Sequence, residues 1–137
     1  MTETPNDIQW LIDGYGAWVA GEAIPVVEDV SIDLGAIETG PWSRMGVDGA
    51  FVHAHSRGDL CSIYVLDIPP GGSTEPVHHL YEAVYFVIDG KGSTVVEGPG
   101  GERRSFEWER AGLFSLPLNA PYRLHNSAAV PAPESRW

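Results

Sequence analysis

The sequence is poor in cysteine and in positive charge. Cys61 is the only cysteine among 137 residues, which excludes an internal disulfide and is typical of a reducing compartment such as the cytoplasm. Eight Lys and Arg residues stand against 19 Asp and Glu residues, so the formal net charge is -11. Nucleic-acid binding needs a clustered basic face, and only Arg103 and Arg104 are adjacent. We therefore predict no nucleic-acid partner, and we expect Cys61 to be a small buried residue of a strand.

Long apolar runs are also lacking. No stretch approaches the roughly 18 apolar residues that a transmembrane helix needs, so we predict no membrane partner. The first ten residues, MTETPNDIQW, have no basic patch followed by an apolar core, and we therefore expect no signal peptide. Together with the single cysteine, these absences predict a cytoplasmic protein.

Glycine and proline, by contrast, are plentiful, with 16 and 11 residues, and they favour short strands and turns over long helices. Residues 1–25 differ, because apolar residues recur there at roughly helical spacing. Asn6 or Asp7 is a suitable N-cap, whereas Gly14 and Gly16 weaken any helix. We expect an N-terminal arm with one or two helical turns, packed on a sheet or on a second subunit.

Beyond residue 25, strand-like segments alternate with turn sequences such as PPGG and DGKG. About nine short strands are expected, at 26–34, 49–56, 60–68, 73–79, 82–89, 92–98, 103–110, 112–118 and 121–126. No helical segment separates them, so residues 26–137 are predicted to form an all-β sandwich or barrel of jelly-roll type.

Two segments of the sequence resemble the two motifs of the cupin superfamily. They are PPGGSTEPVHHLYEAVYFVIDGKGSTVV and RRSFEWERAGLFSLPLNAPYRLHN, and the resemblance covers residues 60–126. The upstream stretches YGAWVAGEAIPVVEDV and GPWSRMGVDGAFVHAH resemble the lead-in of the N-terminal half of larger bacterial bicupin-like proteins. The resemblance implies a small single-domain cupin, whose fold is a double-stranded β-helix, or jelly-roll barrel.

The resemblance also implies a metal site, for which the sequence offers two registers. Counted back from Gly90, the ligand positions of the first cupin motif fall on Val77, His79 and Ala83, and the histidine of the second motif falls on Tyr122. Only His79 is then a usual metal ligand.

In the second register, counted from Gly72, the two histidine positions fall on His78 and Leu80, so the ligand set is again incomplete. Other donors lie near the vacant positions. Glu82 comes one residue before Ala83, the position of the motif glutamate, and His125 is three residues beyond Tyr122. A bulge would bring both adjacent histidines to one face.

Two interpretations of this site stay open. In the first, a divalent metal is bound by His79, Glu82, His125 and His78; Fe(II) is the expected ion, with Mn, Zn or Ni as alternatives. In the second, the pocket is polar and free of metal, and Glu82 and Tyr122 serve with His79 as catalytic acid and base.

A second histidine pair, His53 and His55, lies two residues apart in FVHAHSRGD. Side chains alternate along a strand, so the two imidazoles are predicted to share a face. We expect them to contact substrate rather than metal, and we expect Tyr81 and Tyr85 to line the mouth of the pocket.

The end of the sequence bears on assembly. After Asn126 the chain continues as SAAVPAPESRW, although a cupin normally has a further strand at this point. Pro131 and Pro133 cannot donate ladder hydrogen bonds. A barrel that lacks its last strand has an open edge, which favours association, so we predict a homodimer.

These observations predict a cupin-fold enzyme that acts on a small molecule. With metal, the expected activity is that of a dioxygenase on a small aromatic or dicarbonyl compound. Without metal, the expected activity is that of a lyase or isomerase using acid-base catalysis. A non-catalytic module that binds a small ligand is the remaining alternative.

Overall fold

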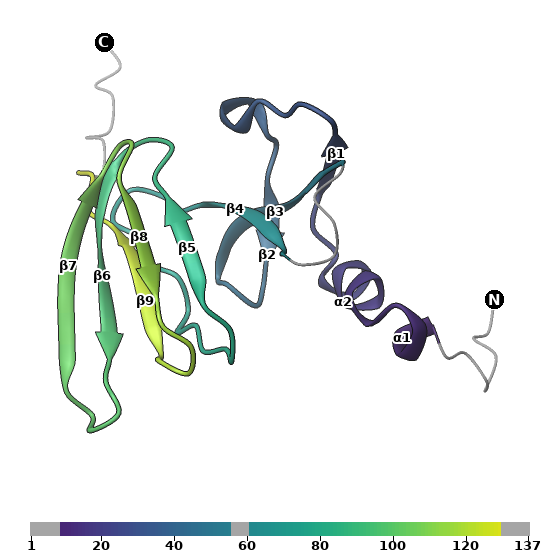
Figure 1. Cartoon of the computed structure of the whole chain (residues 1–137). Helices are drawn as coiled ribbons and strands as arrows, with labels where there is room; N and C mark the ends of the chain where they lie inside the picture. Colours follow the sequence, from purple (N-terminus) through teal and green to yellow (C-terminus); the bar gives the residue numbers. More distant parts are fainter. Residues whose placement is uncertain (1–8, 56–60, 130–137) are drawn as a thin grey trace, which may run out of the picture. The chain divides into compact units, whose positions relative to one another are not determined.

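The structure, a computed structural model, describes residues 9–55 and 61–129 (Figure 1). The chain forms two compact units. The first comprises the described residues of Met1–Arg44 and Asp48–Leu66, and the second comprises Met45–Val47 and the described residues of Asp67–Trp137.

The first unit begins with helices α1 (Gln9–Ile12) and α2 (Gly14–Glu22). Asp13 caps α2, because its side chain accepts a hydrogen bond of 2.9 Å from the backbone N–H of Gly16. The caps expected at positions 6 and 7 lie outside the described residues. In the part of the chain that the structure describes, no helix is long and apolar enough to cross a membrane.

A four-stranded sheet forms the rest of this unit. Its central strand, β3 (Val47–Ala54), pairs with β1 (Val26–Asp29), β2 (Gly40–Trp42) and β4 (Ile63–Asp67), and the β1–β3 pair is parallel. A short 3-10 helix, η1 (Leu34–Ala36), precedes β2. Such a central position explains why β3 is apolar on both faces.

Phe51 of β3 anchors the core of this unit. Its side chain is fully buried and lies 5.2 Å, between ring centroids, from Trp18 of α2 and from Trp42 of β2. The β2 strand is not among the nine expected strands, because burial of Trp42 against Phe51 outweighs the local turn signals of LGAIETGPW. Cys61 is exposed before β4, so the expectation that it is buried was wrong.

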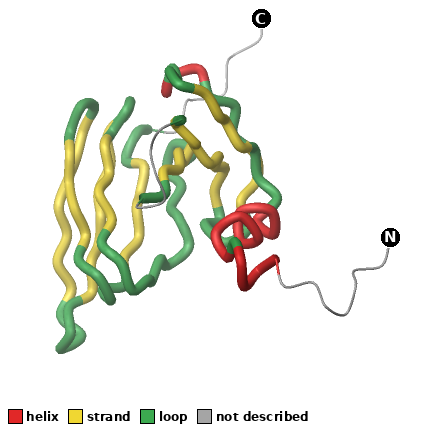
Figure 2. The backbone as a smooth tube through the Cα atoms, turned by 45° about the vertical axis from the view of Figure 1, so that its right-hand side comes forward, coloured by secondary structure: helices red, strands yellow, loops and turns green. Residues whose placement is uncertain are grey.

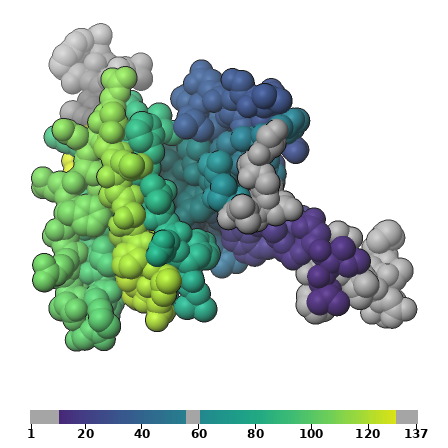
Figure 3. Space-filling model, viewed as in Figure 1, coloured from purple at the N-terminus to yellow at the C-terminus, as the bar shows by residue number. Residues whose placement is uncertain are grey.

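The second unit consists of two antiparallel sheets (Figures 1 and 2). In one, β5 (Ala83–Phe86) pairs with β8 (Leu113–Leu116). In the other, β6 (Lys91–Glu97) lies between β7 (Arg103–Glu109) and β9 (Tyr122–Asn126). Side chains fill the gaps that the ribbon leaves between neighbouring strands of this unit (Figure 3).

Alternation along these strands gives each sheet an inner and an outer face. Phe114 of β8 contacts Tyr85 of β5 and Phe106 of β7, each at 5.3 Å between ring centroids, so these rings lie on the inner faces. On the outer face, Phe86 and Leu113 are opposite each other and are 56% and 70% exposed. The predicted homodimer stays a prediction.

The stretch predicted as a strand over 73–79 is not a regular strand. It follows β9 through isolated bridges, Ser73 opposite His125 and Val77 opposite Tyr122. Four residue steps on one side thus match three on the other, which is a bulge of one residue. Pro76 lies inside this stretch and has no N–H for a continuous ladder.

The same stretch covers the free side of β9. Backbone N–H groups of Gly71, Thr74 and Val77 donate to carbonyls of β9 at 2.8 to 3.0 Å. This side of β9 is therefore occupied by the chain itself, and the missing last strand stays a prediction. Residues 130–137, where a last strand was judged to be missing, lie outside the described residues.

Candidate functional site

His79 lies in the loop that leads from the bulged stretch to β5. The backbone N–H of Asn119 donates to the His79 carbonyl at 2.8 Å and ties this loop to the β8–β9 turn. The imidazole stacks on Tyr81, with 3.9 Å between ring centroids and 3° between planes. Its Nδ1 lies 2.7 Å from the carbonyl oxygen of Tyr81, and its Nε2 lies 2.9 Å from the hydroxyl of Tyr122.

Tyr122 extends this contact into the interior of the unit. It is the first residue of β9 and is only 2% exposed. Its hydroxyl also lies 2.7 Å from the hydroxyl of Tyr85, which comes from β5 in the other sheet. We call the set Tyr85, Tyr122 and His79 the Tyr–Tyr–His relay.

The carbonyl of Tyr81 fixes the direction of the relay. A carbonyl oxygen only accepts, so Nδ1 of His79 carries a proton and, in the neutral ring, Nε2 is an acceptor. Tyr122 then donates its single hydroxyl proton to His79, and its oxygen accepts from Tyr85. All hydrogen-bond donors of the neutral relay thus point toward the imidazole.

The structure also distinguishes the two registers that the sequence offered. Val77 is opposite Tyr122, and Ala83 lies on the inner face of β5, in phase with Tyr85. Leu80 is instead 79% exposed. The count from Gly90 therefore describes the inner positions, and three of its four ligand positions hold Val, Ala and Tyr.

The residues present do not fit a metal centre of the expected kind. In the described part of the chain, no three His, Cys, Asp or Glu side chains lie close enough together to hold an ion. Both ring nitrogens of His79 are used in hydrogen bonds to Tyr81 and Tyr122. A metal ligand needs a free imidazole lone pair, and the relay uses the one that Nε2 offers.

The other three members of the predicted ligand set point elsewhere. Nε2 of His78 bonds to the side-chain oxygen of Asn119 at 2.8 Å, in an exposed position. Nδ1 of His125 bonds to the Ser73 hydroxyl at 2.8 Å, and alternation places this side chain on the face of β9 opposite Tyr122. Glu82 is exposed just before β5. The structure thus brings His79 and Tyr122 together, but not the four predicted ligands.

Of the residues predicted to line the pocket, Tyr85 joins the relay, whereas the two other histidines belong to the first unit. His53 is half-buried, and its Nε2 lies 3.0 Å from the hydroxyl of Tyr15 on α2. His55 is exposed after β3 and lies 3.8 Å from Glu28. Their predicted contact with substrate stays a prediction.

Sequence reasoning missed a group of packed rings beside the relay, Phe106, Trp108 and Phe114, which we call the aromatic wall. Phe114 stacks between Tyr85 and Trp108, and Phe106 meets it edge-on. The available signal was the alternation of aromatic residues in SFEWE, which places Phe106 and Trp108 on one face of β7. Their convergence on Phe114 depends on how the two sheets pack.

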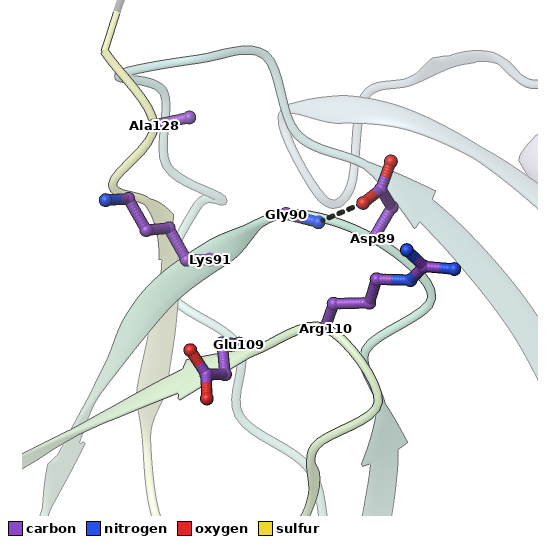
Figure 4. Close-up of a pocket in the computed structure, with 6 residues that line it drawn as sticks. All are labelled: Asp89, Gly90, Lys91, Glu109, Arg110 and Ala128. Atoms are coloured by element: carbon purple, nitrogen blue, oxygen red, sulfur yellow. Dashed lines mark hydrogen bonds between the residues drawn. The ribbon is translucent and has the colours of Figure 1, made fainter.

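A separate hollow of about 330 Å³ lies at the β5–β6 and β7–β8 turns (Figure 4). Its lining residues are Asp89, Gly90, Lys91, Glu109, Arg110 and Ala128. Charges of both signs surround it, and the Gly90 N–H donates to Asp89 at 2.9 Å. None of the predicted site residues contributes to this hollow.

No family model matches this chain, and no curated protein matches it either. Solved structures do match the fold of this chain. The cupin domain of Schizosaccharomyces pombe Cnp3 has a TM-score of 0.57 and 16% identity, with 74% of this chain and 66% of that chain covered. The Drosophila melanogaster CENP-C cupin domain has a TM-score of 0.56 and 13% identity, over 90% and 91% of the two chains.

Oxalate decarboxylase of Lactobacillus farciminis, in its formate complex, has a TM-score of 0.56 and 15% identity over 71% of this chain. This chain spans 29% of that enzyme and about two thirds of the Cnp3 domain chain. Identities of 13% to 16% establish a shared fold rather than a shared activity. Together with the two motifs in the sequence, this agreement confirms the predicted resemblance: the chain is a cupin-fold protein.

Proposed function

We propose that this protein is a metal-independent cupin enzyme that moves a proton on a small molecule, as a lyase or isomerase. One observation carries the proposal. The family position of a metal-binding histidine is held by Tyr122, whose buried hydroxyl joins Tyr85 to an imidazole of fixed tautomer. This arrangement supplies a general base without a metal.

The relay works as a base because of the direction of its hydrogen bonds. A substrate C–H or O–H gives its proton to the Tyr85 oxygen, while the Tyr85 proton passes to Tyr122 and the Tyr122 proton passes to Nε2 of His79. The bond to the substrate proton breaks, one new N–H bond forms, and His79 becomes an imidazolium. Return of the proton to a different substrate atom completes an isomerisation. In an elimination, the substrate electron pair expels a leaving group, and the imidazolium gives its proton to that group through the relay.

The metal-dependent dioxygenase expected from the resemblance is less well supported by this geometry. His79 cannot bind a metal through Nε2 while it accepts from Tyr122, and His125 and His78 make hydrogen bonds elsewhere. Glu82, expected as a catalytic carboxylate, is exposed. We therefore assign the proton transfer to His79, Tyr122 and Tyr85.

Proton abstraction can be tested before the substrate is known. Protein dialysed against a chelator is incubated in D₂O with small carbonyl compounds, and loss of the ¹H signal next to the carbonyl is followed by NMR. We expect exchange above the buffer rate for a subset of these compounds. Tyr122→Phe should lower that exchange by about 10² to 10⁴-fold, the usual contribution of a positioned acid-base group.

Tyr64→Phe is the matched control, because it removes a phenol hydroxyl from the first unit and should leave exchange unchanged. Exchange that disappears on dialysis and returns with Fe(II) would show that a metal performs the step, which contradicts the proposal. A folded protein that binds small molecules and exchanges none of them would instead support the non-catalytic binding module.

A further inference from the structure

We propose that the relay and its aromatic wall select an uncharged, planar ligand that donates a hydrogen bond to Tyr85, such as a phenol or an enol. This inference rests on the proposed function, because it names the class of molecule on which the relay acts. Three properties of the inner faces carry it. They are the stack of the Tyr85, Phe114 and Trp108 rings, the lack of charge beside that stack, and the direction of the hydrogen bonds in the relay.

The ring stack is the first property. Tyr85 and Phe114 are 5.3 Å apart at an interplanar angle of 19°, and Phe114 and Trp108 are 6.0 Å apart at 18°. Three rings from β5, β8 and β7 thus lie nearly parallel. Each is only partly buried, so each keeps a surface that a ligand can reach. Flat rings in this arrangement favour a flat ligand over a puckered one.

The lack of charge is the second property. The inner-facing residues of β5 and β8 are Ala83, Tyr85, Phe114 and Leu116, and none of them is an Asp, Glu, Lys, Arg or His. Trp108 uses its indole N–H on the Thr94 hydroxyl at 2.9 Å. A carboxylate placed here would lose its hydration and, while His79 of the relay is neutral, would gain no cation, which is costly.

Arg104 is the one charged side chain that alternation places on the inner face of the β6–β7–β9 sheet, within its strands as the structure describes them. It is exposed near the start of β7, two strands away from Tyr122 in the sheet order. Adjacent strands are about 4.8 Å apart, so its Cα is about 10 Å from that of Tyr122. The Arg104 side chain is exposed and therefore well hydrated, so it adds little attraction for an anion beside Tyr85.

The direction of the hydrogen bonds in the relay is the third property. Tyr85 donates its proton to Tyr122 whenever Tyr122 donates to His79, so the Tyr85 oxygen meets the ligand as an acceptor. A ligand that only accepts would need the relay reversed, and that reversal requires a second proton on His79, at Nε2 as well as at Nδ1. The preferred ligand is therefore a donor, and that donor proton is the one the relay removes.

Four probes separate these properties: phenol, anisole, cyclohexanol and benzoate. Each is titrated into ¹⁵N-labelled protein, and the indole N–H signal of Trp108, assigned through Trp108→Phe, reports binding. For a ligand of this size we expect phenol to bind with a Kd of about 1–10 mM. Anisole, which is planar but has no donor, should bind roughly three- to tenfold more weakly, the usual effect of one hydrogen bond.

Variants then assign the contacts. Tyr85→Phe should reduce phenol affinity to that of anisole and leave anisole affinity unchanged. Phe114→Leu should weaken phenol and anisole alike. Phe86→Leu, on the outer face of the same strand as Tyr85, is the matched control and should change neither affinity. If Phe114→Leu does not fold, the comparison of phenol with anisole in Tyr85→Phe still decides the contact to Tyr85.

Cyclohexanol or benzoate binding as tightly as phenol would overturn the proposed ligand class, as would a phenol affinity that Tyr85→Phe does not change. Failure of the proposed function looks different. The phenol pattern would then be intact in the unmodified protein, while no compound undergoes proton exchange. Proton exchange confined to puckered or anionic substrates would contradict the proposed ligand class and would still support the proton-transfer function.

Discussion

Both compact units of this protein pair a histidine with a tyrosine hydroxyl, but the two pairs have different surroundings. In the first unit, His53 of β3 meets Tyr15 of α2 at 3.0 Å, and Tyr15 also bonds to the exposed Ser62 at 2.9 Å. In the second unit, His79 meets the buried Tyr122 at 2.9 Å. Both histidines are half-buried, but the tyrosine of the first pair is half-buried and joins a helix to a sheet, whereas the tyrosine of the second pair is fully buried.

The difference shows what turns a structural hydrogen bond into a candidate relay. His79 has its second nitrogen fixed by a backbone carbonyl, and Tyr122 passes the contact on to Tyr85. The three groups therefore form a directed path for a proton. The Tyr15 hydroxyl is shared between His53 and Ser62, and this contact serves to hold α2 against the sheet.

The largest effect that separates the two units is expected from their cores. Phe51→Ala removes a fully buried ring that contacts Tyr15, Trp18 and Trp42 in the first unit. We expect a loss of about 3–5 kcal/mol in the free energy of unfolding, measured by urea denaturation. Native-state hydrogen exchange should show lost protection in β3 and retained protection in β6 and β9. Equal loss of protection in β3 and in β6 and β9 would contradict the division into two units.

A smaller effect is expected when each hydroxyl is removed in turn. Tyr122→Phe leaves Nε2 of His79 and the Tyr85 hydroxyl without their partner inside the barrel, and should cost about 1–3 kcal/mol of stability. Tyr15→Phe frees groups that water can reach, and should cost about 1 kcal/mol or less. Thermal and urea unfolding of both variants measure the difference. A cost for Tyr15→Phe equal to that for Tyr122→Phe would remove the contrast drawn here.

The smallest effect concerns an ion pair of the first unit. A hydrogen bond from Arg44 holds the pKa of the Glu22 carboxyl below its usual value near 4.5, assisted by the Trp42 indole and opposed by partial burial. The folded pKa is lower than the unfolded one, so this stabilisation is full above about pH 4.5 and is lost as the pH falls through the folded value. A pair of this kind is worth about 0.5 kcal/mol.

Glu22→Gln should therefore lower stability slightly at pH 7 and converge with the unmodified protein as the pH falls toward 3. Urea denaturation at a series of pH values measures this convergence. A difference in unfolding free energy between the two proteins that widens in acid would show that the ion pair is not its cause. Glu28→Gln, at an exposed carboxylate 3.8 Å from His55, is a suitable control.

Much of the fold was predictable because its signals are local. Alternating apolar residues and turn sequences such as DGKG predicted β5 to β9, and the resemblance of two segments to the cupin motifs implied a cupin barrel. Two elements were not predictable in this way. The β2 strand depends on burial of Trp42, and the stretch over 73–79 is interrupted by a bulge that only its pairing with β9 reveals.

The candidate site was predictable only in part. Its spacing indicated that His79 and Tyr122 occupy family ligand positions, and it left the register open between Gly90 and Gly72. The exposure of Leu80 and the pairing of Val77 with Tyr122 decide that register. His125 does not share the inner face with Tyr122, because the two residues are three positions apart on β9 and side chains alternate along a strand.

The sequence alone predicted an all-β chain, because alternation is a property of consecutive residues, and its resemblance to the cupin motifs implied the fold and an incomplete ligand set. Only the tertiary structure decided what replaces the missing ligands. The relay joins a loop, β5 and β9, and its direction depends on one backbone carbonyl next to His79. Hydrogen bonds between residues 37 and 43 positions apart depend on how the sheets pack, and no local pattern encodes them.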